Sequence, residues 1–445
     1  MNEESRYLRV NMSTASEQDE IRAGRLKEDA PVHDLQLMEQ VVEAFNLRCA
    51  LHKVQSNKGS GGIDGKTVDD LPAYLKQHWP AIKSQLLDGT YQPQPVKQVM
   101  IPKASGGERK LGIPTVVDRF IQQALLQVLQ PEWDRKFSLS SFGFRPNRSA
   151  HQAVKLSQHY INHGSRWVVD MDLEKFFDRV NHDVLMSRVK RRVSDKRVLN
   201  LINKFLKAGA LSGDEYWESD EGTPQGGPLS PLLANVLLDD LDKELEKRGH
   251  QFVRYADDCN IYVRSLYAGR RTLASISHWL RCKLKLKVNE QKSAVDRPWN
   301  RSFLGFTFSP RGKYKKVKVC DKAINQLKYR VRVLTRRTRG RTITHIITDL
   351  RKYLLGWRGY FGLSEIKGAL VNLDKWIRRK LRCYIWKQWG RSGYRQLRKR
   401  GVKRILAWNT AKSAHGPWRI SHSPALYIAL PACLFIKMGV PALAE

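Results

Sequence analysis

The stretch Phe252-Val-Arg-Tyr-Ala-Asp257-Asp258-Cys-Asn-Ile-Tyr-Val263 places two adjacent aspartates between two runs of β-favouring residues. This pattern predicts a β-hairpin that carries carboxylates at its turn. Neighbouring residues in a strand point to opposite faces, so only one of the two can aim squarely at a shared ion. We assign that role to Asp257 and a more peripheral one to Asp258. Aspartate also favours turns in general, so the pair taken alone is more often structural than functional.

A second acidic segment lies upstream, where residues 167–173 predict a buried strand that ends in acidic residues. A carboxylate at the end of a buried strand costs free energy unless it meets a metal or another partner, which makes Asp172 a candidate metal ligand. Asp170, on the same strand face, is the alternative. Asp172 and Asp257 on neighbouring strands would offer oxygen ligands to two divalent cations, Mg²⁺ by preference. Such a pair can activate a 3′-hydroxyl and stabilise a leaving pyrophosphate, which is nucleotidyl transfer.

The charge of the chain indicates a polyanionic partner. Its 79 Lys and Arg residues against 43 Asp and Glu give a formal net charge of +36 over 445 residues. Residues 311–405 hold 30 of these cations and four acidic residues, a net charge of +26. Nucleic acid is the commonest partner of so basic a chain. A purely electrostatic RNA-binding protein would show the same charge, so composition selects a partner and not an activity.

Composition also predicts the compartment and the domain organisation. The six cysteines are scattered without a C-x-x-C pair, which argues against a zinc knuckle or a disulfide framework and favours the reducing cytoplasm. We expect a flexible leader over 1–35, an α/β domain over 36–309 and helices at 321–337, 342–355 and 370–388 within a helical domain over 320–390. Residues 391–445 are basic and then apolar. The apolar part is too short to span a membrane, and we expect it to pack against the protein.

Six further segments follow one another in an order that, together with the two acidic segments, resembles the reverse transcriptases and, within them, the group II intron proteins. The resemblance covers about residues 40–390 and rests on the ordered set, which is far more specific than any one member. The segments are Gly61-Gly-Ile-Asp-Gly65, Ile101-Pro-Lys-Ala-Ser-Gly-Gly-Glu-Arg-Lys-Leu-Gly-Ile-Pro114, Ser141-Phe-Gly-Phe-Arg-Pro-Asn-Arg148, Thr223-Pro-Gln-Gly-Gly-Pro-Leu-Ser-Pro231, Leu286-Lys-Val-Asn-Glu-Gln-Lys-Ser293 and Phe303-Leu-Gly-Phe-Thr-Phe308.

The resemblance implies an α/β right-hand polymerase, in which fingers and palm with a mostly antiparallel palm sheet precede an all-α thumb and maturase domain. It implies that Asp172, Asp257 and Asp258 form the catalytic metal site, with two Mg²⁺ ions as cofactor. The implied nucleotide-binding residues are Lys103, Arg109, Phe177, Gln225 and Lys292. Lys103 and Arg109 flank a Gly-Gly turn, where they could clamp a triphosphate by charge and bidentate hydrogen bonds. Phe177 would exclude a 2′-hydroxyl, and Gln225 would shape the nucleotide pocket.

The helical domain interleaves aromatic residues with cations. Most of these aromatics are expected to pack between helices, whereas the cations are expected to face phosphates. The region resembles the maturase-specific domain, which implies that it binds the parent intron RNA and assists its splicing. The expected RNA- or DNA-binding residues are Arg145, Arg358, Arg378, Arg379, Lys380 and Arg382.

The resemblance also implies partners: group II intron RNA, an RNA template with a DNA primer, deoxynucleotides and target DNA. The family's endonuclease module, marked by paired Cys and His residues, is not recognisable in residues 391–445, whose basic half fits a small DNA-binding segment. We therefore expect retrotransposition by target-primed reverse transcription without an endonuclease of its own, in the cytoplasm and at the nucleoid. The alternatives are an RNA-binding splicing factor in which polymerisation is incidental, and a reverse transcriptase used in antiviral defence. The oligomeric state stays open.

Overall fold

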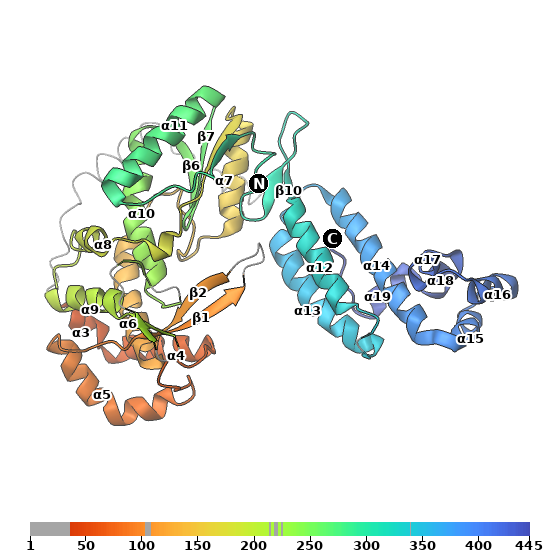
Figure 1. The fold of residues 1–445 in the computed structure, drawn as a ribbon, viewed down its shortest axis with the longest axis horizontal. Coiled ribbons are helices and arrows are strands. Elements are labelled where there is room, and N and C mark those ends of the chain that lie inside the picture. The colour runs from red at the N-terminus through yellow and green to blue at the C-terminus, as the bar shows by residue number, and fades with distance from the viewer. Residues whose placement is uncertain (1–35, 103–107, 213–214, 218–220, 224–225, 339) are drawn as a thin grey trace, which may run out of the picture.

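The computed structural model describes residues 36–102, 108–212, 215–217, 221–223, 226–338 and 340–445. They form two lobes, a larger one of helices and sheets and a smaller helical one (Figure 1). At the centre of the larger lobe lies a four-stranded sheet in the order β6-β7-β3-β8, antiparallel throughout, as expected for a palm. Its strands are β3 (Trp167–Met171), β6 (Gln251–Tyr255), β7 (Asp258–Val263) and β8 (Ala294–Asp296).

The two faces of this sheet are covered by different helices because successive side chains alternate between them. Val168 packs in a cluster with residues of α7 (Ala150–Asn162) on one face. Its neighbour Val169 packs on the other face, in the cluster that contains α10 (Ser230–Lys247) and α11 (Leu266–Trp279). The middle of the central strand β3 is therefore buried on both faces, which leaves the end of the sheet for the site.

The fingers are built from segments on both sides of β3 in the sequence, and they share the large hydrophobic cluster of the palm. A hairpin of β1 and β2 projects from them, and β1 also pairs in parallel with β4, giving the sheet order β2-β1-β4-β5. The elements are α3 (Leu37–Val41), α4 (Ala44–Ser56), α5 (Leu71–Leu87), β1 (Val96–Pro102), β2 (Glu108–Ile113), α6 (Val116–Asp134), η1 (Phe176–Asp178), α8 (His182–Val189), α9 (Lys196–Lys207), β4 (Ala210–Ser212) and β5 (Glu215–Trp217).

The second lobe is helical, as expected for a thumb. It follows η2 (Leu280–Leu284), β9 (Phe306–Phe308) and β10 (Val317–Val319), and it comprises α12 (Asp321–Leu334), α13 (Ile343–Phe361), α14 (Lys367–Trp389), η3 (Gly390–Ser392), α15 (Gly393–Lys399), α16 (Arg404–Lys412), α17 (Pro417–Ile420), α18 (Pro424–Ala429) and α19 (Ala432–Lys437). The expected break at Gly356 is wrong. Helix α13 continues past it because Leu350, Leu354 and Trp357 bury one continuous stripe.

The C-terminal segment is part of the thumb. One hydrophobic cluster runs from Val319 to Leu443, so the expected boundary near residue 390 does not separate two cores. The carboxylate of Asp374, on α14, accepts hydrogen bonds from the backbone amides of Leu443 and Ala444 at 3.0 to 3.3 Å. The expectation that the apolar tail packs against the protein is confirmed. No helix in the described part of the chain is long and apolar enough to cross a membrane.

The two lobes touch at the end of α13. Tyr360 donates its hydroxyl hydrogen to the Leu304 carbonyl at 3.0 Å. Phe361 packs against the palm cluster that contains Phe306. These contacts fix the base of the thumb beside the palm sheet.

Replacing Asp374 by alanine should weaken the attachment of the C-terminal segment. The amides of Leu443 and Ala444 would lose their buried acceptor, which costs about 1–3 kcal/mol. We expect a corresponding decrease in the free energy of unfolding, measured by urea denaturation. The control Lys375→Ala, at an exposed position on the same helix, should change this energy by less than about 0.5 kcal/mol. Equal effects of the two substitutions would contradict the role of Asp374.

Candidate active site

The β6–β7 hairpin forms the centre of the site. Tyr255 and Asp258 are paired, so Ala256 and Asp257 make a two-residue turn. The predicted hairpin is confirmed, with Asp257 in the turn and Asp258 as the first residue of β7. Ala256 takes the left-handed conformation with φ 56°. A non-glycine residue holds this conformation only where surrounding contacts impose it.

Asp172 lies beside this turn. It follows Met171, the last residue of β3, which is paired with Cys259 of β7. Its backbone is fixed from the other side, because its amide donates to Ser293 Oγ at 3.0 Å and its carbonyl accepts from the Asn289 amide at 2.8 Å. The structure thus brings Asp172, Asp257 and Asp258 together, and we call these three residues the aspartate edge.

The electrostatics of the aspartate edge favour a cation. Loss of hydration raises the pKa of Asp258 to about 7, and repulsion from Asp257, Asp170 and Asp172 adds to the effect, although the side chain keeps solvent contact. Loss of hydration and the charge of Asp172 also raise the pKa of Asp257. A divalent cation would relieve this repulsion. Within the described residues, no three His, Cys, Asp or Glu side chains are arranged as a ready-made metal cluster.

Two nearby cations compensate the acids at the end of β3, Asp170 and Asp172. Arg301 binds the carboxylate of Asp170 at 2.6 and 2.8 Å, so the alternative ligand is already paired within the protein. Lys292, predicted to bind nucleotide, has its Nζ 3.3 Å from Asp172 Oδ2. The structure therefore places Lys292 at the aspartate edge itself.

Among the described residues of the fingers, Arg109 lies near the aspartate edge. Arg109, on β2, lies near enough for its charge to lower the pKa of Asp257, against the larger effect of lost hydration. Lys103 and Gln225 lie outside the described residues. Gly226, next to Gln225, has φ 135° and approaches β2 so closely that a Cβ would lie 2.5 Å from the Gly112 carbonyl oxygen. Only glycine fits this contact between the loop and the hairpin.

Phe177, predicted to exclude a 2′-hydroxyl, lies on η1 and is partly buried against the large cluster. Its carbonyl accepts a hydrogen bond from the Thr223 amide at 2.7 Å. This bond ties the segment that leads to Gln225 to the segment that follows Asp172. The structure therefore connects two parts of the predicted nucleotide pocket.

Two of the predicted nucleic-acid-binding arginines are not placed on a binding surface. Arg145 is 8% exposed, and its guanidinium binds Asp134 at 2.7 Å and the carbonyls of Ser138 and Ser141. Arg382 is 3% exposed and donates to the Leu430 carbonyl at 2.9 Å. The prediction was wrong for these two residues because both guanidinium groups are buried and bonded within the protein, Arg145 to the nearby 134–141 segment and Arg382 to the distant Leu430.

The other predicted thumb cations are partly committed to the C-terminal segment. Arg379 and Lys380 lie over the Trp418 ring, 4.0 and 4.5 Å from its centroid. Arg358 donates to the Ala442 carbonyl at 3.1 Å. Arg378 is half-buried on α14. The interleaved aromatics and cations thus serve first to attach this segment by cation–π contacts.

Sequence reasoning missed Arg254, which is fully buried directly before the turn and paired with Asp242. Burial lowers the pKa of Arg254, but the Asp242 carboxylate more than offsets this, so that the pKa lies above its ordinary value. The sequence does carry a signal for this residue, because an arginine within an apolar strand needs a buried partner.

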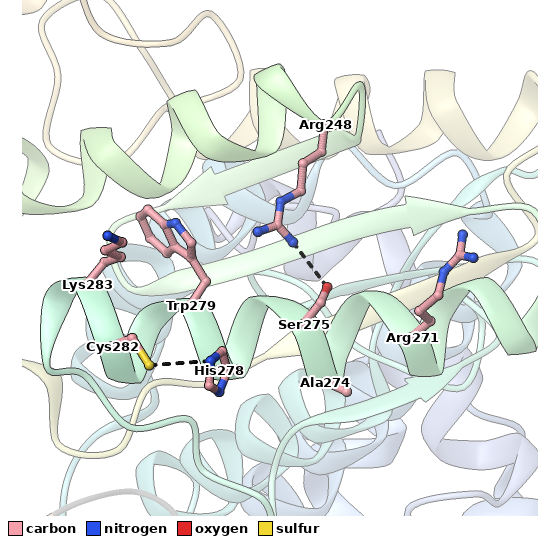
Figure 2. A pocket seen from close by; sticks show the side chains of 8 residues that line it. All are labelled: Arg248, Arg271, Ala274, Ser275, His278, Trp279, Cys282 and Lys283. Carbon is pink, nitrogen blue, oxygen red and sulfur yellow. Dashed lines mark hydrogen bonds between the residues drawn. The ribbon is translucent and has the colours of Figure 1, made fainter.

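Figure 2 shows a pocket formed by α10, α11 and η2. His278 and Cys282 approach each other there, with Nε2 and Sγ 3.5 Å apart. This pocket contains none of the predicted site residues. Its lining residues are Arg248, Arg271, Ala274, Ser275, His278, Trp279, Cys282 and Lys283.

Comparison with known families divides the chain in the same way as the fold. Residues 101–308 match the reverse transcriptase (RNA-dependent DNA polymerase) family, and residues 324–403 match the group II intron maturase-specific domain. With its antiparallel palm sheet and aspartate edge, the chain belongs to the reverse transcriptases. The match of the thumb to the maturase-specific domain narrows the class of reverse transcriptase: the chain is a member of the group II intron reverse transcriptase/maturase family.

The chain is similar to several curated proteins. It is 41% identical to the group II intron-encoded protein LtrA of Lactococcus lactis, over 55% of this chain and 40% of that protein. It is 40% identical to protein YkfC of Escherichia coli, over 43% of this chain and 52% of that protein. A putative COX1/OXI3 intron 2 protein of Saccharomyces cerevisiae is 27% identical, over 73% and 45% of the two chains. The chain thus spans about half the length of the relatives it matches.

The loop that backs the aspartate turn should not tolerate a side chain at Gly143. A Cβ there would lie 2.2 Å from the Ala256 amide nitrogen. We expect Gly143→Ala to lower the free energy of unfolding by about 1–3 kcal/mol through overpacking. Gly356→Ala, in a helix with open space, should raise it by about 0.5–1 kcal/mol. Urea denaturation of both variants tests this, and a neutral Gly143→Ala would contradict the close approach.

Proposed function

We propose that this protein is an RNA-directed DNA polymerase that also binds its parent group II intron RNA and assists its splicing. The observation that carries the proposal is the convergence of Asp172, Asp257 and Asp258 at one end of the palm sheet, opposite the β1–β2 hairpin with Arg109. The match of residues 101–308 to reverse transcriptases supports the same activity.

The aspartate edge would hold two Mg²⁺ ions, with Asp172 and Asp257 as main ligands and Asp258 assisting. Its hard oxygen donors suit magnesium, and the charge repulsion among them favours a bound cation. When bound, such ions supply Lewis-acid activation of a primer 3′-hydroxyl and charge stabilisation of the pyrophosphate. The primer hydroxyl is the nucleophile, so the protein need only orient the reactants and neutralise charge.

The remaining residues would handle the nucleotide. Lys103 and Arg109 would neutralise the triphosphate, while Phe177 and Gln225 would shape the pocket around the sugar and base. Lys292, at 3.3 Å from Asp172, would stay close enough to reach the phosphates. An RNA template paired with a DNA primer would lie between palm and thumb.

The thumb would carry the splicing role. The match of residues 324–403 to the maturase-specific domain supports intron RNA as its partner. Cations on α12 that are not committed to the C-terminal segment, such as Lys322 and Arg330, are exposed. We further propose that the protein acts in the cytoplasm and, in retrotransposition, at the target DNA.

A splicing factor in which polymerisation is incidental remains the second candidate, favoured by the net charge of +26 over 311–405. The two candidates differ in whether the aspartate edge is needed. A role in antiviral defence is disfavoured by the maturase-specific match.

Asp257→Asn should abolish DNA synthesis and spare RNA binding. Loss of a metal ligand should lower the rate of deoxynucleotide incorporation by at least about 100-fold. The assay uses a DNA-primed RNA template with Mg²⁺, and the affinity for intron RNA is measured in parallel. Asp69→Asn, at an exposed position in the fingers, is the charge-matched control. Equal loss of synthesis and RNA binding would argue against a catalytic role, and an inactive native protein would favour the splicing factor.

Replacing three exposed thumb cations should weaken intron RNA binding. In Lys322→Gln/Arg330→Gln/Arg336→Gln, each lost phosphate contact should reduce the slope of log affinity against log salt by about 0.7–0.9. The matched variant Lys53→Gln/Lys76→Gln/Lys83→Gln removes the same charge from exposed positions on α4 and α5. Filter binding over a salt series measures both. An unchanged slope in the thumb variant, or the same change in both, would contradict a specific thumb interface.

A further inference from the structure

Arg254 is bonded to three different elements around the aspartate turn. Its Nε and Nη2 donate to the two carboxylate oxygens of Asp242 at 2.7 and 2.6 Å. Nη1 donates to Asn235 Oδ1 at 3.0 Å and to the Ala256 carbonyl at 2.9 Å, and Nη2 also donates to Ser141 Oγ at 2.8 Å. A guanidinium has five N–H donors, and these five bonds use all of them.

Only one of these bonds reaches the turn, and the other four anchor the guanidinium. Asn235 and Asp242 are seven residues apart on α10 and therefore lie on the same face of that helix. Ser141 belongs to the segment that backs the turn. The bond to Ala256 therefore connects the turn to a rigid helix and to a second, independent segment of the chain.

The turn needs such a connection. Ala256 holds a left-handed conformation that is unfavourable for a residue with a Cβ. The following residues, Asp257 and Asp258, carry like charges next to Asp172, and their repulsion would tend to spread a mobile turn. The backbone of Gly143 closes the other side of Ala256, and Asn235 Nδ2 holds the Gly143 carbonyl at 2.8 Å. Asn235 thus supports both the arginine and the loop.

We propose that Arg254 is a positioning residue for the aspartate edge: through Ala256 it holds Asp257 and Asp258 in place beside Asp172 so that they bind divalent cations together. This inference rests on the proposed polymerase function for its catalytic consequence. Its direct consequence is metal affinity, which can be measured without catalysis.

A purely structural ion pair is the competing explanation. A buried pair can be replaced by apolar residues of similar volume with little loss of stability, whereas removal of one partner leaves an uncompensated charge. The informative variant is therefore Arg254→Met/Asp242→Leu, which keeps the packing and removes the bond to Ala256. A matched control is Arg188→Met/Asp240→Leu, which replaces a pair that also involves α10 but makes no bond to the turn.

The experiment measures three quantities on the full chain. Mn²⁺ binding is followed by electron paramagnetic resonance without nucleotide, the Mg²⁺ dependence of deoxynucleotide incorporation gives a half-saturating concentration, and thermal unfolding reports stability. Loss of a group that orients metal ligands typically lowers metal affinity by about 10–100-fold. We expect this weakening, and a matching rise in the half-saturating Mg²⁺ concentration, in Arg254→Met/Asp242→Leu but not in the control.

A second variant covers the case in which the double substitution fails to fold. Arg254→Lys keeps a positive charge beside Asp242, but a single ammonium cannot reproduce the planar fork that spans Asp242, Asn235, Ser141 and Ala256. It should remain folded and show weakened Mn²⁺ binding, with unchanged affinity for template–primer duplex.

The outcomes separate the inference from the proposed function. If both Arg254 variants bind Mn²⁺ as tightly as the control, or if the native protein binds none, the inference is overturned. If the native protein binds Mn²⁺ and the Arg254 variants lose it, while no protein incorporates nucleotide, the positioning role stands and the polymerase function fails. A lower unfolding temperature with unchanged metal affinity would leave Arg254 a purely structural residue and would also overturn the inference.

Discussion

The concentration of carboxylates at one end of the palm sheet is the constraint on which the rest of the site depends. Loss of hydration raises the pKa of Asp258 to about 7, and repulsion from Asp257, Asp170 and Asp172 adds to the effect. The protein compensates the acids at the end of β3, with Arg301 on Asp170 and Lys292 on Asp172. The two turn aspartates have no such intramolecular counterion at bonding distance among the described residues. The remaining negative charge lies on the side where Arg109 of the fingers acts on Asp257, and a divalent cation bound there would balance it.

The positions of these acids are determined by backbone contacts from outside the sheet. The end of β3 is held by the 289–293 segment, and the turn is held by Arg254 and by the close approach of Gly143. Gly226 joins the next loop to β2. Each contact comes from a segment that also belongs to the family pattern. The 141–148 and 286–293 segments therefore share a physical role, because they fix the backbone of the aspartate edge from two sides.

The thumb uses its cations in two ways. Some, such as Arg379 and Arg382, bind aromatic rings and carbonyls of the C-terminal segment and so attach this segment to the rest of the thumb. Others, such as Lys322 and Arg330 on α12, lie exposed to solvent. Fewer cations of this region are therefore free to contact RNA phosphates than its net positive charge alone would indicate. It remains consistent with a maturase-specific domain, since a few well-placed cations supply most of the electrostatic attraction.

The sequence by itself determined the hairpin, the acidic end of β3, the antiparallel palm and the family, because alternation, turn chemistry and segment order are local properties that survive without coordinates. It also indicated which acids would meet. It could not show that α13 continues through Gly356, that Arg145 and Arg382 are buried, or that Arg254 holds the turn. Those facts depend on which parts of the folded chain pack against each residue. A cation on a helix looks the same in sequence whether it faces solvent or Leu430, and only the tertiary structure decided between the two.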